Sequence, residues 1–141
     1  MFILGPSHHA HLRKCSLSGF DSLITPLGNL KIDDTIRDEL LQTDLFDITP
    51  SAVDEDEHSI EMHLSFLFKA MEESAHYTVI PIMVDALTPS QLESTSTVLA
   101  KYVDEPGNIF ILSSDFCHWG KRFQYQPYDA SKVYIDYSYM I

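Results

Sequence analysis

The chain has 141 residues, of which 45% are hydrophobic and 21% charged, so it is long enough for one domain with a core and is not typical of a disordered protein. Its formal net charge of −12, with nine Lys and Arg residues, argues against binding to nucleic acid or to an anionic membrane surface. It has no apolar run long enough for membrane insertion, no signal-peptide pattern and no disulfide framework, so we expect a single cytoplasmic domain over residues 1–141.

Short strands are predicted in the first part of the chain. Residues 2–4 are an apolar run that ends at Gly5 and Pro6, as a buried strand entering a turn does. Residues 12–32 contain strand-like pieces, and the sequence PLGN at 26–29 indicates a hairpin or a bend. This region therefore links the first strand to the helices that follow.

Two helices are predicted next. Residues 35–43 follow Asp33 and Asp34, whose charges are favourable at the N-terminal end of a helix dipole. A second helix is predicted to begin near Asp56 and to run to about residue 73. Its apolar residues recur with helical spacing and form one stripe, which consists of Ile60, Leu64, Leu67, Phe68 and Met71.

The remaining elements alternate again between strand and helix. Residues 77–84, YTVIPIMV, read as a strand covered on both faces, and residues 108–115, NIFILSSD, read as another buried strand. Between them, residues 90–102 are predicted to form an amphipathic helix, and a last helix is expected to begin within YIDYSYMI at 134–141. The alternation predicts an α/β sandwich with a mainly parallel sheet.

Two of the predicted strands lead directly into polar, ionisable segments, GPSHHAH and SSDFCHWG. In open α/β sheets ligands bind outside the carboxyl ends of the strands, so we expect these two loops to face each other. His8, with His9 or His11, is a candidate source of imidazole for a metal, and Asp115 with His118 offers a carboxylate and a second imidazole or an acid–base pair. Iron, copper and zinc all accept such ligands. The alternative is a His8 bonded to the backbone and an Asp115 that caps its turn.

The segment DEDEHSIEMHL is a second, weaker candidate site. Glu57 and Glu61 would share a helical face with His58, as in di-metal carboxylate helices, but the repeated motif of those proteins is missing. A solvated acidic first turn is the better explanation of residues 54–57. A polar network with neighbouring strands explains Glu61 and His63.

The other conspicuous side chains near the second loop have structural explanations. Cys117 is expected to be a small buried residue, because no partner spacing marks it as a reactive thiolate. Phe110, Phe116 and Trp119 are expected in the core or in a pocket wall. Gly-rich phosphate loops, GxSxG elbows and HExxH motifs do not occur, so the sequence lacks the usual signatures of hydrolases and nucleotide-binding proteins.

Four segments together resemble the Memo family, the mediators of receptor-tyrosine-kinase-driven cell motility. They are FILGPSHH, FDSLITPLGNLKID, DEDEHSIEMHL and SSDFCHWGKRF, in this order between Phe2 and about Tyr134. The resemblance implies a Memo-like α/β fold related to class III extradiol dioxygenases, a redox-active copper site with iron as the alternative, and recognition of phosphotyrosine segments in receptor tails. It implies His8 as a metal ligand, and Asp115 and His118 as catalytic residues of the same pocket.

The family pattern also extends beyond this sequence. An upstream histidine in a PHAGY-type segment and a downstream cysteine near a CGRHP-type segment complete the family's metal set, and neither occurs here. We therefore expect the central segment of a Memo-like domain, with an incomplete sheet and an incomplete metal site. Three functions stay open: a copper-dependent oxidoreductase, a non-enzymatic phosphotyrosine-peptide adaptor, and a shortened form that exposes sheet edges and does neither.

Overall fold

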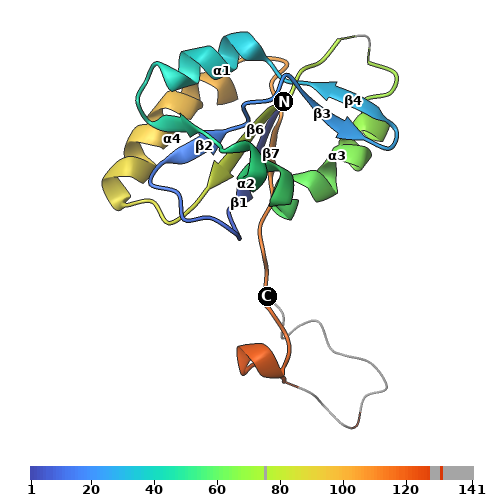
Figure 1. Cartoon of the computed structure of the whole chain (residues 1–141), viewed down its shortest axis with the longest axis vertical. Coiled ribbons are helices and arrows are strands. Elements are labelled where there is room, and N and C mark those ends of the chain that lie inside the picture. Colours follow the sequence, from blue (N-terminus) through green and yellow to red (C-terminus); the bar gives the residue numbers. More distant parts are fainter. Residues whose placement is uncertain (75, 128–130, 132–141) are drawn as a thin grey trace.

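A computed structural model describes residues 1–74, 76–127 and 131. Within these residues, five strands form a mainly parallel sheet in the order β5-β2-β6-β1-β7, and β3 and β4 form a separate hairpin (Figure 1). The strands are β1 Phe2–Pro6, β2 Cys15–Leu17, β3 Ser22–Thr25, β4 Gly28–Lys31, β5 Phe46–Ile48, β6 Ile80–Val84 and β7 Phe110–Leu112. The hairpin predicted at PLGN is the β3–β4 turn.

Strand β1 lies between two parallel neighbours from the second half of the chain. Phe2 pairs with Ile80 of β6 on one side and with Phe110 of β7 on the other. On its far side β6 pairs antiparallel with β2, which in turn pairs parallel with β5. The mainly parallel sheet predicted from the sequence is thus confirmed, with β2–β6 as its antiparallel step.

The described helices are α1 Asp34–Leu41, α2 Ser51–Asp56, α3 His58–Ala70, α4 Pro89–Val103 and the 3₁₀ helix η1 Lys121–Phe123. Three of them, α1, α3 and α4, begin at a residue whose side chain caps them. Asp33 caps α1 by accepting the Ile36 backbone N–H at 3.1 Å. A capping box of Thr88 and Gln91 starts α4, with Pro89 in its first turn.

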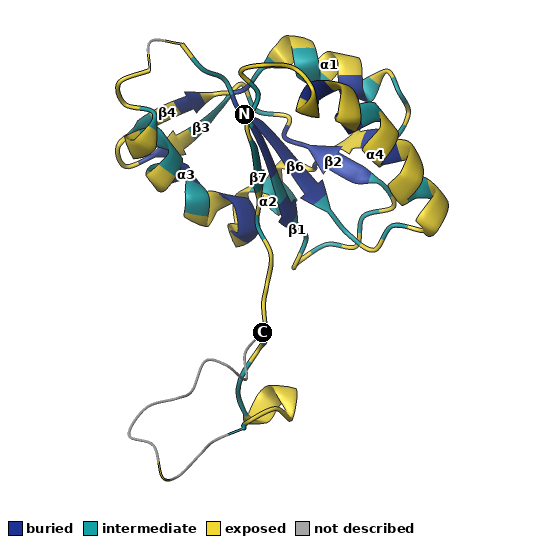
Figure 2. Cartoon of the chain, turned by 180° about the vertical axis from the view of Figure 1, so that it is seen from behind, coloured by how far each residue is buried: buried dark blue, intermediate teal, exposed yellow. Residues whose placement is uncertain are grey.

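The sheet is covered on both faces, which gives three layers. Helices α1 and α4 lie on one face, while α3 and the β3–β4 hairpin lie on the other, and the strands between them are largely buried (Figures 1 and 2). Neighbouring residues of β1 point to opposite faces, as strand geometry requires. Phe2 packs with Leu40 and Tyr102, whereas Ile3 packs with Ile60 and Leu64.

Some expectations about the last strand need correction. Residues 108–115 were expected as a buried strand, but among the described residues β7 pairs with β1 alone, and Leu112 is 72% exposed. Phe116 was expected in the core or in a pocket wall, yet it is 80% exposed because the chain leaves the sheet after β7 (Figure 1). Phe110 does belong to the core, where its ring stacks on Phe2 with centroids 4.6 Å apart.

The helix predicted from Asp56 onward is interrupted. Glu57 has an extended backbone (φ −87°, ψ 126°), so it separates the unpredicted short helix α2 from α3. The predicted apolar stripe is confirmed, with Ile60 and Leu64 buried in the core. The helix expected at 134–141 lies outside the described residues. In the described part of the chain, no helix is both long and apolar enough to cross a membrane.

Candidate functional site

The carboxyl ends of β1, β6 and β7 open into one shallow cavity of about 540 Å³. The backbone holds these ends level, because the Ser7 N–H donates to Val84 at 2.9 Å and the Ser113 N–H donates to Leu4 at 2.8 Å. The lining residues come from all three strand ends: Leu4, Gly5, Pro6, Ser7, Val84, Asp85, Ala86, Leu112, Ser113, Ser114 and Asp115. This is the edge of the sheet at which the sequence predicts a ligand site.

His8 and Asp115 meet at this edge. The His8 Nε2 lies 2.7 Å from Asp115 Oδ2, so the two predicted loops do face each other. His118 is less close, with its Nε2 3.6 Å from the same Asp115 oxygen. The hydrogen bond from His8, followed by the charges around it, lowers the pKa of Asp115. The structure therefore brings the three predicted site residues together around one carboxylate.

Glu57 holds His8 from the opposite side. It is the N-cap of α3, and its side chain is only 1% exposed. One oxygen, Oε2, accepts the His8 backbone N–H at 2.6 Å, while Oε1 accepts the His8 ring Nδ1 at 2.9 Å and the Ser59 backbone N–H at 2.9 Å. The solvated acidic turn expected at residues 54–57 is thus wrong for Glu57, because the loop after β1 covers it.

The two carboxylates decide the protonation of His8. An ionised carboxylate only accepts hydrogen bonds, so both ring nitrogens carry protons in this arrangement. Hydrogen bonds to Glu57 and then to Asp115 raise the pKa of His8. Burial opposes ionisation of Glu57, but hydrogen bonds from His8 and Ser59 outweigh that effect and lower its pKa to about 2. The His8 ring is therefore oriented by a buried charge.

Two further histidines lie beside this pair. The His58 ring stacks on His8 with centroids 4.5 Å apart, and His9 meets His58 edge-on at 5.7 Å. Potential ligand atoms of His8, Glu57 and His58 lie within 4.8 Å of one another. Both Glu57 oxygens already accept backbone N–H groups, however, so we interpret Glu57 as the group that orients His8.

The remaining sequence candidates form no hydrogen bond or ion pair with His8 or Asp115 among the described residues. His11 pairs with Asp85 at 2.7 Å, and the same Asp85 oxygen accepts the Leu12 backbone N–H at 2.7 Å. That backbone hydrogen bond is the main reason why the pKa of Asp85 is lowered. Glu61 is exposed on α3, and Glu57 lies outside that helix, so the helical carboxylate face that was considered as the weaker candidate does not form.

Sequence reasoning missed Glu57, His58 and Asp85 as parts of this edge. Asp85 could have been found, because it follows the apolar strand β6 as directly as the polar segments follow β1 and β7. Glu57 gives no such signal, since its partner His8 is 49 positions away in the sequence. Of the two cysteines, Cys15 is buried, whereas Cys117 is only half-buried.

Comparisons with known proteins agree on one family. A family model described as Memo-like protein matches residues 1–140. Protein MEMO1 of Homo sapiens is 49% identical over 133 residues, which is 94% of this chain and 45% of that protein. Protein memo-1 homolog of Caenorhabditis elegans is 44% identical over 129 residues, which is 92% of this chain and 37% of that protein. The chain thus spans less than half the length of these curated relatives.

Proposed function

This chain belongs to the Memo-like protein family, and we propose that it acts as a Memo-type metal-binding protein that binds a copper ion at the edge of its strand-end cavity through Nε2 of His8. One observation carries the proposal: a buried carboxylate, Glu57, fixes the His8 ring so that Nε2 points to Asp115. The chain covers less than half the length of these relatives, so any activity or partner of the longer proteins is only proposed for this chain.

The residues present fit such an ion. Metal-binding histidines usually donate their second ring N–H to a carboxylate, which is the arrangement between His8 Nδ1 and Glu57. Copper or iron accepts an imidazole such as that of His8, and Asp115 and His118 place a carboxylate and a second imidazole beside Nε2, next to the ion. When bound, copper would supply one-electron redox chemistry, and iron is the alternative metal.

The protein's own side chains have separate tasks in this proposal. Glu57 orients the His8 ring, and Nε2 of His8, without its proton, would hold the ion. Asp115 then no longer receives the hydrogen bond from His8. Its Oδ2, 3.6 Å from His118 Nε2, is free to pair with that imidazole, so Asp115 and His118 are the pair that holds or moves a proton.

The cellular role that we propose is the one implied by the resemblance, cytoplasmic signalling from receptor tyrosine kinases to cell motility. The alternative adaptor function would use the same imidazoles to bind a phosphotyrosine peptide. It has weaker support, because the carboxylates of Glu57 and Asp115 lie against the His8 ring and the chain has a net charge of −12. Both features repel a phosphate group.

Metal content tests the proposal directly. The full 141-residue chain is dialysed against reduced copper, and bound metal is measured by mass spectrometry for the wild type and for His8→Ala combined with His118→Ala. A His76→Ala variant serves as the matched control, since His76 is exposed and lies away from the strand ends. We expect a saturable site in the wild type and in the control, and its loss in the double variant.

A thermal melt adds a second readout. Copper at 100 times its dissociation constant stabilises a protein by about 2.7 kcal/mol, which raises the melting temperature by several degrees at this chain length. If the double variant bound as much copper per chain as the wild type, the assignment of His8 and His118 to the copper site would be wrong. Binding of a phosphotyrosine peptide, but not of its unphosphorylated form, to metal-free protein would favour the adaptor instead.

A further inference from the structure

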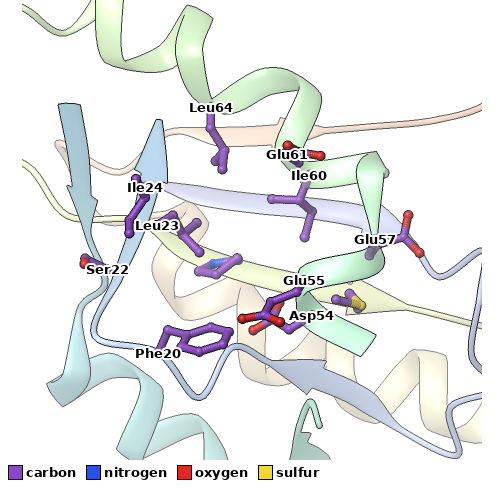
Figure 3. Close-up of a pocket in the computed structure, with 12 residues that line it drawn as sticks. Phe20, Ser22, Leu23, Ile24, Asp54, Glu55, Glu57, Ile60, Glu61 and Leu64 are labelled. Carbon is purple, nitrogen blue, oxygen red and sulfur yellow. The ribbon is translucent and has the colours of Figure 1, made fainter. Parts of the chain in front are cut away.

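The residue that follows Glu57 supplies another imidazole at the strand-end site. Figure 3 shows Glu57 at the junction of α2 and α3, with its carboxylate pointing away from the cavity between α3 and the β3–β4 hairpin, and this carboxylate binds the loop after β1. His58 is the first residue of α3, and its ring stacks on the His8 ring with centroids 4.5 Å apart and 22° between the planes. Two successive residues therefore provide the carboxylate that orients His8 and an imidazole beside it.

The His58 side chain is accessible and has room to move. It is 49% exposed, whereas the Glu57 side chain beside it is 1% exposed. Its Nδ1 lies 3.5 Å from Glu57 Oε1, and in the described part of the chain its ring makes no hydrogen bond. The ring can therefore turn about its side-chain bonds without breaking a hydrogen bond, and an ion can reach it from solvent.

His58 is better placed beside His8 than the two histidines that the sequence suggested as its companions. Potential ligand atoms of His8, Glu57 and His58 lie within 4.8 Å of one another, and within the described residues this group includes neither His9 nor His11. The His9 ring instead meets His58 edge-on at 5.7 Å. The His11 ring is paired with another carboxylate. The structure thus favours an imidazole 50 positions further along the chain.

The charges around the two rings favour a cation. Glu57 Oε1 lies 2.9 Å from Nδ1 of His8 and 3.5 Å from Nδ1 of His58, so one buried carboxylate faces both imidazoles. Asp115 adds a second carboxylate at Nε2 of His8. A carboxylate at the second nitrogen is the usual setting of a metal-binding histidine, and imidazole is a ligand that copper accepts.

We propose that His58 is a second ligand of the copper ion, next to His8. This inference rests on the proposed function, because it needs an ion at His8. It gives the site two imidazoles from different elements, one from the loop after β1 and one from the first turn of α3. It leaves His118 with Asp115 as the pair that holds or moves a proton.

Two matched variants separate a ligand from a ring that only stacks. His58→Phe keeps an aromatic ring against His8 and removes both nitrogens, and His9→Phe makes the same change at the neighbouring exposed histidine. The dissociation constant for reduced copper is measured on the full 141-residue chain by competition with a coloured chelator. We expect His58→Phe to raise it by about 100-fold, because even groups that only orient a ligand are worth about 10–100-fold. His9→Phe should leave it unchanged.

NMR of the wild type gives a readout that does not depend on how a variant folds. Reduced copper is diamagnetic, so the ring nitrogen signals of all histidines stay visible when the ion is added. We expect one ring nitrogen signal of His8 and one of His58 to shift together, and those of His9 to stay in place. A wild type that binds no copper would overturn the proposed function and this inference with it. Copper binding with a shift at His8 but not at His58, or with equal affinity in His58→Phe and the wild type, would overturn this inference alone.

Discussion

Replacing Glu57 with Gln keeps the shape of the side chain and removes its buried charge. Oε2 of Glu57 accepts the His8 backbone N–H at 2.6 Å, and Oε1 accepts the Ser59 backbone N–H at 2.9 Å. A Gln amide offers one oxygen and one NH₂ group in place of two oxygens. Whichever way the amide is turned, a backbone N–H of His8 or of Ser59 then faces another donor.

The size of the effect follows from these contacts. A buried donor without a partner costs about 1–3 kcal/mol, so we expect Glu57→Gln to lower the free energy of unfolding by about 2–4 kcal/mol once weaker bonds to the ring are included. The lowered pKa of Glu57, which has the same hydrogen bonds as its cause, leads to a value of the same order. Burial alone would raise that pKa, but hydrogen bonds from His8 and Ser59 lower it from 4.5 to about 2, which corresponds to a stabilisation on the order of 3 kcal/mol.

The pH dependence has a definite sign. A carboxyl group with a lowered pKa in the folded state stabilises the protein above the unfolded pKa of 4.5, and this stabilisation is lost as the pH falls from 4.5 to about 2. The difference in unfolding free energy between the wild type and Glu57→Gln should therefore be largest at pH 7. At pH 4 it should be smaller by about 1 kcal/mol.

Urea denaturation followed by circular dichroism at pH 7 and pH 4 measures both quantities. Glu55→Gln is the matched control, because Glu55 is an exposed neighbour on α2 and its neutralisation should change stability by less than about 0.5 kcal/mol. If Glu57→Gln were as stable as this control, or if its deficit were the same at both pH values, the interpretation of Glu57 as a buried, ionised anchor of His8 would be wrong.

Three further predictions concern other parts of the chain. Asp85→Asn should destabilise the protein by about 1–2 kcal/mol at pH 7, and the deficit should disappear as the pH falls below 3.8, because the lowered pKa of Asp85 makes its stabilisation acid-sensitive. The two cysteines should react differently with iodoacetamide at pH 8, as measured by mass spectrometry. Cys117 should react in the native protein, whereas Cys15 should react only in urea, because burial raises the pKa of Cys15 to about 11. Equal labelling rates of the two cysteines in the native protein would contradict this. Gly28→Ala should cost about 2–3 kcal/mol in a urea melt, because φ is 152° and an added Cβ would lie 2.3 Å from the Phe68 ring; an unchanged midpoint would show that the ring moves aside freely.

The meeting of His8 and Asp115 was predictable because it depends on a general rule about sheets. Each residue follows an apolar run, and the ends of parallel strands in one sheet lie at the same edge. The long helix α3 was predictable for a similar reason, since its apolar residues repeat with helical spacing. Both predictions use local sequence patterns, which do not depend on contacts with residues far away in the sequence.

Features that depend on distant contacts could not be predicted. A run of acids such as residues 54–57 has the same local pattern whether it is solvated or buried, and only the loop after β1 decides that Glu57 is buried. Strands β2 and β5 have three residues each, too few to show a period. The exposure of Leu112 likewise depends on β7 having one neighbour among the described strands, which its apolar sequence does not reveal.

The position of β1 between β6 and β7 has a consequence for how the chain folds. On a ribosome β1 is made before β6 and β7, yet among the described strands Phe2 pairs with Ile80 and Phe110. At synthesis rates of ~5–20 residues per second, β1 waits on the order of ten seconds before β7 exists. Contacts between such distant residues also slow folding itself. The strand that carries the His8 loop therefore gains both of its neighbours only after β7 has been made.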